Sequence, residues 1–178
     1  STRVIELNPE STTEDFCEAV ENVVHDSDGI IVQLPLPPHV DVQTVFAHIP
    51  VSHDVDALNP ENHSVLSPVV GAFFEILSRY NIVIEGKHVT IIGNGRLVGL
   101  PACAWFQSAG AHVSVVTKDT GDISTYTKTA DIVVCGAGSS GLLTPDMIKD
   151  NAIVLDAGTS EEGGELRGDA DPLCAEKA

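Results

Sequence analysis

The sequence predicts an α/β protein in which a doubly wound parallel sheet follows a smaller, partial α/β lobe. From residue 88 onward, short β-branched runs alternate with helical patterns, which is typical of parallel strands joined by helices. Glycine-rich turns follow three of these runs, at 93–99, 135–141 and 156–159. We therefore divide the chain into a partial lobe at 1–66, an interlobe helix at 67–80 and a sheet domain at 81–178.

The first lobe carries the pattern of a β-α-β unit. We expect strands at 3–7 and 29–33, and between them a helix that starts in a capping box at 11–14 and ends near His25. The prolines of 34–41 exclude helix and central strand, which leaves a rigid loop. A short helix at 41–48 and an Asp- and Asn-rich turn at 53–62 complete the lobe.

The second part alternates regularly. A helix with apolar residues at helical spacing covers 69–80. The elements expected after it are strands at 88–93, 112–116, 131–134 and 152–156 and helices at 101–110, near 121–129 and at 144–150.

The charge of the chain excludes several classes of partner. The formal net charge is -17, and no Lys or Arg occurs between Arg3 and Arg79. Binding to nucleic acid or to an anionic membrane surface is therefore disfavoured. No apolar run reaches the roughly 18 to 20 residues of a membrane span, and no secretory signal pattern opens the chain. We expect a soluble, cytoplasmic protein.

Cysteine and histidine spacing does not indicate a metal site. The four cysteines lack C-x-x-C spacing, and Cys17, Cys103 and Cys135 fall in apolar patterns where a buried thiol is expected. Five histidines occupy the first third of the chain without the spacing of a zinc site, so we expect solvated or locally bonded rings. These histidines are residues 25, 39, 48, 53 and 63.

The turn GNGRLVGLP at 93–101 has the chemistry of a phosphate-binding loop. Its glycines allow the backbone to approach a pyrophosphate, and the following helix offers free amides and a partial positive charge. The spacing is G-x-G-x-x-x-G, which as a bare pattern also fits a tight turn. Because the turn lies between a predicted strand and helix, it favours a Rossmann-type dinucleotide site.

Five segments resemble one family in its own order. Residues 29–41 are similar to the G-I-[LI]-V-Q-L-P-L-P signature of the bifunctional methylenetetrahydrofolate dehydrogenase/cyclohydrolases, and residues 53–62 to their K-D-V-D-G-[FL]-[HN]-P-x-N loop. Residues 93–101 resemble G-R-S-x-x-V-G-x-P, 152–160 resemble A-[VI]-V-I-D-V-G-I-N and 164–171 resemble G-[KR]-L-x-G-D-V-D. The resemblance implies a folate-binding lobe before a Rossmann domain.

That resemblance also implies an activity and its residues. It implies NADP-dependent oxidation of 5,10-methylenetetrahydrofolate, hydrolysis of the methenyl product, and a homodimer. Gln33 and Asp56 match positions that contact the pterin and support catalysis, and Leu34 and Pro35 match substrate-binding positions. From the residues alone, Gln33 would be a loop anchor and Asp56 an Asx-turn former.

The cofactor implied is NADP, with NAD as the alternative. Asp119, after the second strand, is placed to bond a ribose 2′-hydroxyl and so favours NAD, whereas Lys118 and Arg96 offer partners for a 2′-phosphate. The expected cofactor-binding residues are Gly93, Asn94, Gly95, Arg96, Val98, Gly99, Thr117, Lys118, Cys135, Gly136, Ala137, Gly138 and Thr159.

Several departures from the family pattern bear on the activity. Asn94 stands where the family has Arg, Ala57 where it has Gly, and residues 66–69 replace Pro-Cys-Thr-Pro. The Y-x-x-x-K segment, with its catalytic lysine, would precede residue 1, and P-V-P-G-G-V-G-P-M-T would follow the chain. We therefore expect no cyclohydrolase activity from these 178 residues alone. The alternatives are a non-catalytic dinucleotide-binding paralogue, a fragment of the family's enzyme, and a dehydrogenase of another substrate.

Overall fold

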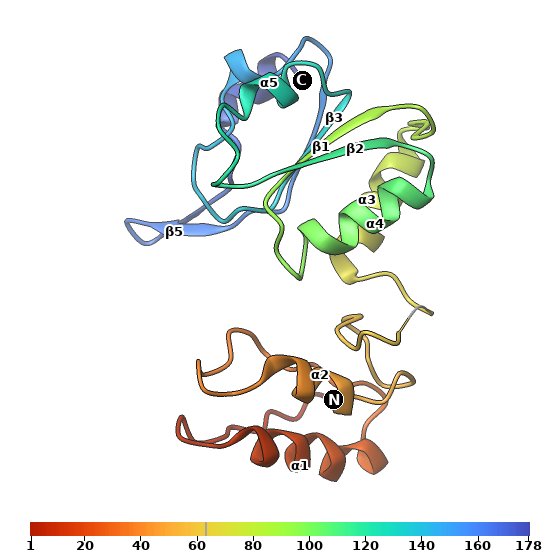
Figure 1. Ribbon diagram of the computed structural model, residues 1–178, viewed down its shortest axis with the longest axis vertical. Coiled ribbons are helices and arrows are strands. Elements are labelled where there is room, and N and C mark those ends of the chain that lie inside the picture. The colour runs from red at the N-terminus through yellow and green to blue at the C-terminus, as the bar shows by residue number, and fades with distance from the viewer. Residues whose placement is uncertain (63) are drawn as a thin grey trace. The chain divides into compact units, whose positions relative to one another are not determined.

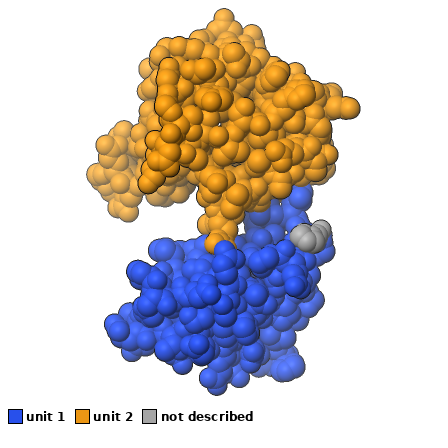
Figure 2. Space-filling view, in the orientation of Figure 1, with its two compact units in different colours: residues 1–68 blue, residues 69–178 orange. Residues whose placement is uncertain are grey.

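The chain forms two compact units, residues 1–68 and residues 69–178 (Figures 1 and 2). The structure is a computed structural model that describes residues 1–62 and 64–178. None of the helices in these ranges combines the length and apolarity that crossing a membrane requires. Each unit has its own apolar core, so each is described by itself.

Unit 1 is built on two helices, as the sequence predicts. Helix α1 (Thr13–Val23) starts at a capping box one residue later than predicted, in which Thr12 and Asp15 exchange backbone-to-side-chain hydrogen bonds of 2.7 and 3.2 Å. A 3-10 turn, η1 (Val24–Asp26), follows. Helix α2 (Val42–His48) is capped by the Asp41 carboxylate. Both helices contribute to two small cores, which contain the buried residues Val20, Ile30, Phe46, Ile49 and Leu58 and the buried residues Cys17, Val40 and Val45.

The prediction of strands at 3–7 and 29–33 is wrong, because neither stretch of unit 1 forms one. The first stretch is irregular, with Val4 79% exposed. In the second, Ile30 forms an isolated parallel bridge with Asp54, and its N–H donates to His53 O at 2.7 Å. A strand is stabilised by a ladder of such hydrogen bonds along its whole length. The apolar composition of these two stretches predicted strands, but composition does not provide a hydrogen-bonded neighbour.

Unit 2 contains the predicted parallel sheet. Its strands are β1 (His88–Ile92), β2 (His112–Val116), β3 (Ile132–Cys135) and β4 (Ile153–Asp156). They lie in the order β2-β1-β3-β4, and all three pairs are parallel. The last residues of the four strands, Val116, Ile92, Cys135 and Asp156, are in register. Four loops therefore leave the sheet side by side at its carboxyl edge.

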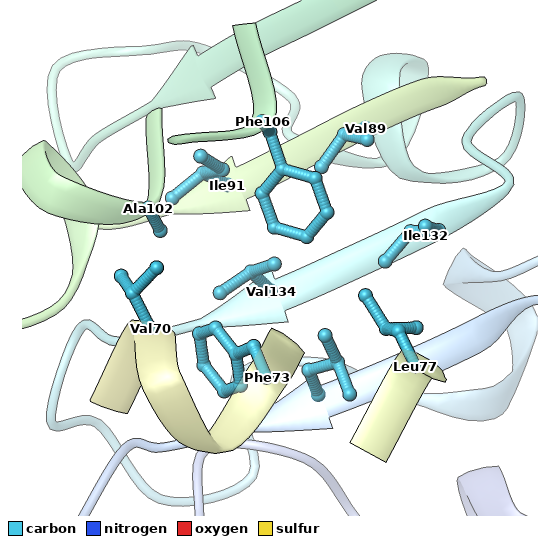
Figure 3. Packing of buried hydrophobic residues seen from close by; sticks show 10 residues of the cluster. Val70, Phe73, Leu77, Val89, Ile91, Ala102, Phe106, Ile132 and Val134 are labelled. Atoms are coloured by element: carbon cyan, nitrogen blue, oxygen red, sulfur yellow. The ribbon is translucent and has the colours of Figure 1, made fainter. Parts of the chain in front are cut away.

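Both faces of the sheet are covered, which confirms the doubly wound arrangement. Helices α3 (Pro68–Arg79) and α4 (Gly99–Ser108) pack on one face (Figure 3). The opposite face of the sheet has its own core and is covered by the short helices α5 (Ser124–Thr127), η2 (Pro145–Met147) and η3 (Pro172–Glu176). The core in Figure 3 consists of Val70, Phe73, Leu77, Val89, Ile91, Ala102, Phe106, Ile132, Val134 and Leu155.

Two expected helices of unit 2 are wrong in length or type. The polar helix predicted near 121–129 is reduced to the four residues of α5. In place of the helix predicted at 144–150, residues 145–147 form the 3-10 turn η2. In the latter, the Met147 carbonyl accepts from Thr127 Oγ1 at 2.6 Å, and Ile148 is extended and buried. Tertiary contacts therefore outweigh the local helical pattern.

A β-hairpin that the sequence did not indicate follows β4. Strands β5 (Ser160–Glu162) and β6 (Glu165–Arg167) pair antiparallel. Gly163 and Gly164 join them with φ of 63° and 83°, the left-handed conformation that a tight hairpin turn requires. The hairpin extends away from the sheet (Figure 1).

Candidate functional site

The carboxyl edge of the sheet in unit 2 gathers all the residues predicted to bind the cofactor. Ligands of open α/β sheets bind at this edge. The residues brought together there are Gly93, Asn94, Gly95, Arg96, Val98 and Gly99 after β1, Thr117 and Lys118 after β2, Cys135, Gly136, Ala137 and Gly138 at the end of β3, and Thr159 after β4. Cys135 is fully buried, and burial strongly raises the pKa of its thiol. Its side chain therefore belongs to the core.

Three of these glycines are required by close packing. A Cβ on Gly93, whose φ is 101°, would lie 2.5 Å from Gly136 O, and a Cβ on Gly99 would lie 2.2 Å from Gly93 O. A Cβ on Gly136 would lie 2.6 Å from Val98 Cγ1. The turn after β1, the start of α4 and the loop after β3 therefore form one tightly packed body.

Gly95 differs from these three because its Cβ position is open. The nearest atom to a Cβ there would be Gly136 O at 3.9 Å, and the residue is exposed. The adjacent helix α4 has Val98 as its N-cap and no side-chain capping bond. An open glycine turn in front of an uncapped helix N-terminus fits a phosphate group. Asn94 and Arg96 flank Gly95 and are exposed.

The loop after β2 forms a closed turn. Thr120 N–H donates to Thr117 O at 2.9 Å, and Thr117 N–H donates to Thr120 Oγ1 at 3.0 Å. Asp119 N–H donates to Thr117 Oγ1 at 3.3 Å. Lys118 and Asp119, the two residues with opposite expected effects on cofactor choice, are exposed at the tip of this turn.

Asp169 is a site residue that the sequence reasoning did not single out. Its carboxylate is completely buried and accepts the N–H groups of Ala137, Gly138 and Ser139 at 2.7, 3.1 and 2.7 Å. The segment 164–171 was noted only as a family motif. A buried acid in that motif could have been suspected, but its partners lie 30 to 32 residues away in sequence, so no local spacing indicates them.

In unit 1, Ile30 and Asp54 form a parallel bridge, so the two chain segments that leave it run in the same direction. Gln33 lies on one of these segments and Asp56 on the other. Gln33 is exposed, and its Nε2 donates to Leu34 O at 3.1 Å. The peptide bond between Leu34 and Pro35 is cis. Leu34 packs partly against the core of unit 1 while Pro35 is exposed.

The two acids of the 53–62 loop have different environments. Asp54 is buried, and its carboxylate accepts the N–H groups of Leu58 and Asn59 and the Asn62 amide at 2.9 to 3.0 Å. Asp56 is half-buried, and its carboxylate makes no hydrogen bond within residues 1–62 and 64–178. Burial, followed by the Asp54 charge, raises the pKa of Asp56. Asp54 therefore shapes the loop, and Asp56 is available to a ligand.

Three of the five histidines of unit 1 are hydrogen-bonded, and His25 is exposed. Rings of His39 and His48 bond the carbonyls of Ser11 and Thr44 at 3.0 and 2.8 Å, and His53 Nδ1 lies 2.9 Å from Ser52 Oγ. His63 lies outside the described residues. Within the part of the chain that is described, no three metal-ligating side chains come together.

A surface groove of about 470 Å³ lies between α1 and α2. It contains none of the predicted site residues. It is acidic, and Cys17 lies in its wall with a pKa raised mainly by burial. Its lining consists of Thr13, Glu14, Cys17, Glu18, Glu21, Thr44 and His48.

The parallel sheet, the open glycine turn and the uncapped helix define a Rossmann-type dinucleotide-binding unit. The chain belongs to the tetrahydrofolate dehydrogenase/cyclohydrolase family, because residues 67–178 match its NAD(P)-binding domain and residues 1–56 match its catalytic domain. This match confirms the family predicted from the sequence motifs.

Similar proteins include the bifunctional protein FolD of Desulforamulus reducens, which is 40% identical over 151 residues, or 80% of this chain and 53% of that protein. The structure of FolD from Campylobacter jejuni has a TM-score of 0.89 at 35% identity and covers 96% of this chain. The Trypanosoma brucei enzyme complexed with NADP cofactor and inhibitor has a TM-score of 0.86 at 31% identity and covers 97% of this chain. This chain spans 65% of each of those two.

Proposed function

We propose that this protein catalyses the NADP-dependent oxidation of 5,10-methylenetetrahydrofolate and, where the lysine-bearing Y-x-x-x-K segment is also present, the linked hydrolysis of the 5,10-methenyl product, in one-carbon metabolism. The observation that carries this proposal is the open turn at Gly95 in front of the uncapped N-terminus of α4. This feature lies at the ligand-binding edge of the sheet, in a chain of the tetrahydrofolate dehydrogenase/cyclohydrolase family.

The residues of the sheet edge would hold the cofactor. The backbone of Gly95 and the first turn of α4 would face the pyrophosphate, with Gly93, Gly99 and Gly136 keeping the three segments close. Bound NADP would supply the hydride acceptor. Complex formation with NADP by the Trypanosoma brucei relative supports NADP over NAD, and Lys118 offers a cation for the 2′-phosphate.

The residues beyond the bridge in unit 1 would bind the folate. The carboxylate of Asp56 would accept charge-assisted hydrogen bonds from the amino-pyrimidine edge of the pterin, and the exposed Gln33 amide would contact the same ligand. Leu34 and Pro35 would form the wall beside it. Because the Asp56 carboxylate has no partner among the described residues, binding a pterin breaks no existing bond of that side chain.

A non-catalytic dinucleotide-binding role is the second candidate, and one observation favours it. Unit 1 contains no lysine in residues 1–68, so it offers no amine for proton transfer to the folate. Production of NADPH from 5,10-methylenetetrahydrofolate separates the two candidates, since only the enzyme produces it.

The test of the cofactor site is calorimetric titration with NADP and NAD. Gly95→Val should abolish binding, because a side chain would fill the space in front of α4 without displacing a neighbour. Gly71→Val is the matched control: it lies in α3 with no atom within 4 Å of its Cβ position, and it should bind normally. Equal binding by wild type and Gly95→Val would contradict the proposed site.

The folate site has its own test. Asp56→Ala in the active protein should weaken folate binding, because the charge-assisted bonds to the pterin are lost. Unchanged kinetics in Asp56→Ala would reduce the residue to a turn former.

We further propose a cytoplasmic homodimer with a tetrahydrofolate derivative as its substrate and no nucleic-acid or membrane partner. The net charge of -17 supports the exclusions. Four free thiols support a reducing compartment. Strand β2 is an edge of the sheet with Val115 37% exposed, and an exposed edge is suited to a protein contact. Light scattering after gel filtration tests the dimer.

A further inference from the structure

The loop after β3 rests on a buried negative charge. Three consecutive amides, those of Ala137, Gly138 and Ser139, converge on the Asp169 carboxylate at 2.7 to 3.1 Å. Gly138 has a φ of 67°, so the loop takes a left-handed turn around the carboxylate. Asp169 is 0% exposed and cannot itself touch a ligand.

Asp169 is in turn held by the end of β4. The Asp156 carboxylate accepts the N–H groups of Gly158, Asp169 and Ala170 at 3.0, 3.3 and 2.9 Å. Gly158 leaves the room that Asp169 needs, because a Cβ there would lie 2.0 Å from Asp169 Cγ. The two carboxylates therefore fix the loops after β3 and β4 relative to each other.

This arrangement decides which part of a dinucleotide the loop accepts. Backbone amides that converge in a turn commonly bind a phosphate, but here the protein's own carboxylate already occupies them. The buried charge also repels a second anion at short range. The first turn of α4 contains no acidic residue, and among the described residues only Gly136 O lies within 4 Å of the Gly95 Cβ position. Phosphate therefore belongs at the β1 turn, and the β3 loop suits an uncharged group.

We propose that Asp169 is a positioning residue for the nicotinamide half of the cofactor. It holds 137–139 in the conformation that packs beside the glycine turn, and it gives this loop a surface of carbonyl oxygens and Cα hydrogens for the nicotinamide riboside. The proposal rests on the proposed function, because it assumes that NADP binds at this edge. It adds to that site a buried residue that holds the loop without touching the cofactor.

The experiment compares two probes by calorimetry, NADP⁺ and 2′,5′-ADP, which lacks the nicotinamide half. Asp169→Asn keeps the size but presents an NH₂ group to loop amides that need an acceptor, so the loop must shift. An unsatisfied buried donor should weaken NADP⁺ binding by about tenfold or more, whereas 2′,5′-ADP should bind as to wild type. Asp131→Asn is the matched control.

Asp131 also accepts a backbone amide, that of His88 at 2.8 Å, but at the opposite edge of the sheet. Asp131→Asn should lose stability and bind both probes as wild type does. If Asp169→Asn does not fold, Gly138→Ala replaces it, because its φ of 67° strains the same loop while the nearest atom to the new Cβ is 3.6 Å away. It should show the same selective loss.

Equal weakening of both probes in the loop variant would overturn the positioning role and leave a merely structural one. Unchanged NADP⁺ affinity in Asp169→Asn would overturn it as well. If the wild type binds neither probe, the proposed cofactor site fails first, and this inference fails with it.

Discussion

Gly99→Ala should destabilise unit 2 although alanine is the better helix former. The substitution lies at the first residue of α4, where alanine gains less than the roughly 0.8–1 kcal/mol that it gains over glycine in a helix interior. The added Cβ would lie 2.2 Å from Gly93 O and 2.9 Å from Asn94 Cα. Both are backbone atoms, so relief requires a shift of the turn after β1, and overpacking of this kind costs about 1–3 kcal/mol. We expect a net loss of about 1–2 kcal/mol.

Urea unfolding followed by the fluorescence of Trp105 measures this loss. Trp105 is the single tryptophan of the chain and lies in α4, with its ring 4.7 Å from Phe106, so it reports unit 2. Gly71→Ala in α3 is the control, because its Cβ would meet no atom within 4 Å, and it should stabilise by about 0.5–1 kcal/mol. Gly99→Ala should also weaken NADP binding. A variant as stable as wild type with normal NADP affinity would refute the packing argument.

Three other substitutions test single contacts. Ala57 has a φ of 53°, so Ala57→Gly should stabilise by about 1 kcal/mol in thermal unfolding; a loss would show that the loop bears no strain there. The Lys149 ammonium, followed by His88 N–H, lowers the pKa of Asp131. The ionised Asp131 carboxylate therefore stabilises the folded state fully above the ordinary pKa of 3.8, and this stabilisation is lost as pH falls below that value. A difference in unfolding free energy between wild type and Asp131→Asn that stays constant across this pH range would exclude the linkage. Wild type should bind NADP more tightly than NAD, as measured by the ratio of dissociation constants. If wild type instead prefers NAD by about tenfold or more and Asp119→Ser abolishes this preference, Asp119 is the residue that selects the cofactor.

The sheet of unit 2 could be predicted because each strand is short, β-branched and followed by a turn signal. The run 88–92 and the glycines after it specify a strand and a tight turn locally. The strands expected at 3–7 and 29–33 could not be judged this way, because a strand exists only with a hydrogen-bonded neighbour. Composition does not reveal whether that neighbour is there.

The position of the candidate site in the fold was predictable where it depends on backbone freedom. Gly93, Gly95 and Gly99 are found at the expected edge, although their sequence did not separate the packing glycines from the open one. Asp169 depends on a contact between distant segments, and its carboxylate resembles any surface acid in the sequence. Buried carboxylates of this kind are recognised only once the fold brings their amide partners together.

Amide chemical shifts during a titration with NADP test the central claim most directly, because they locate the ligand on the chain. We predict that the shifts concentrate at 93–99, 117–120 and 136–139, at the carboxyl edge of the sheet. The opposite edge, at Lys87 and Asp131, should stay unchanged. Shifts confined to the groove between α1 and α2, or no shifts at saturating NADP, would contradict the account.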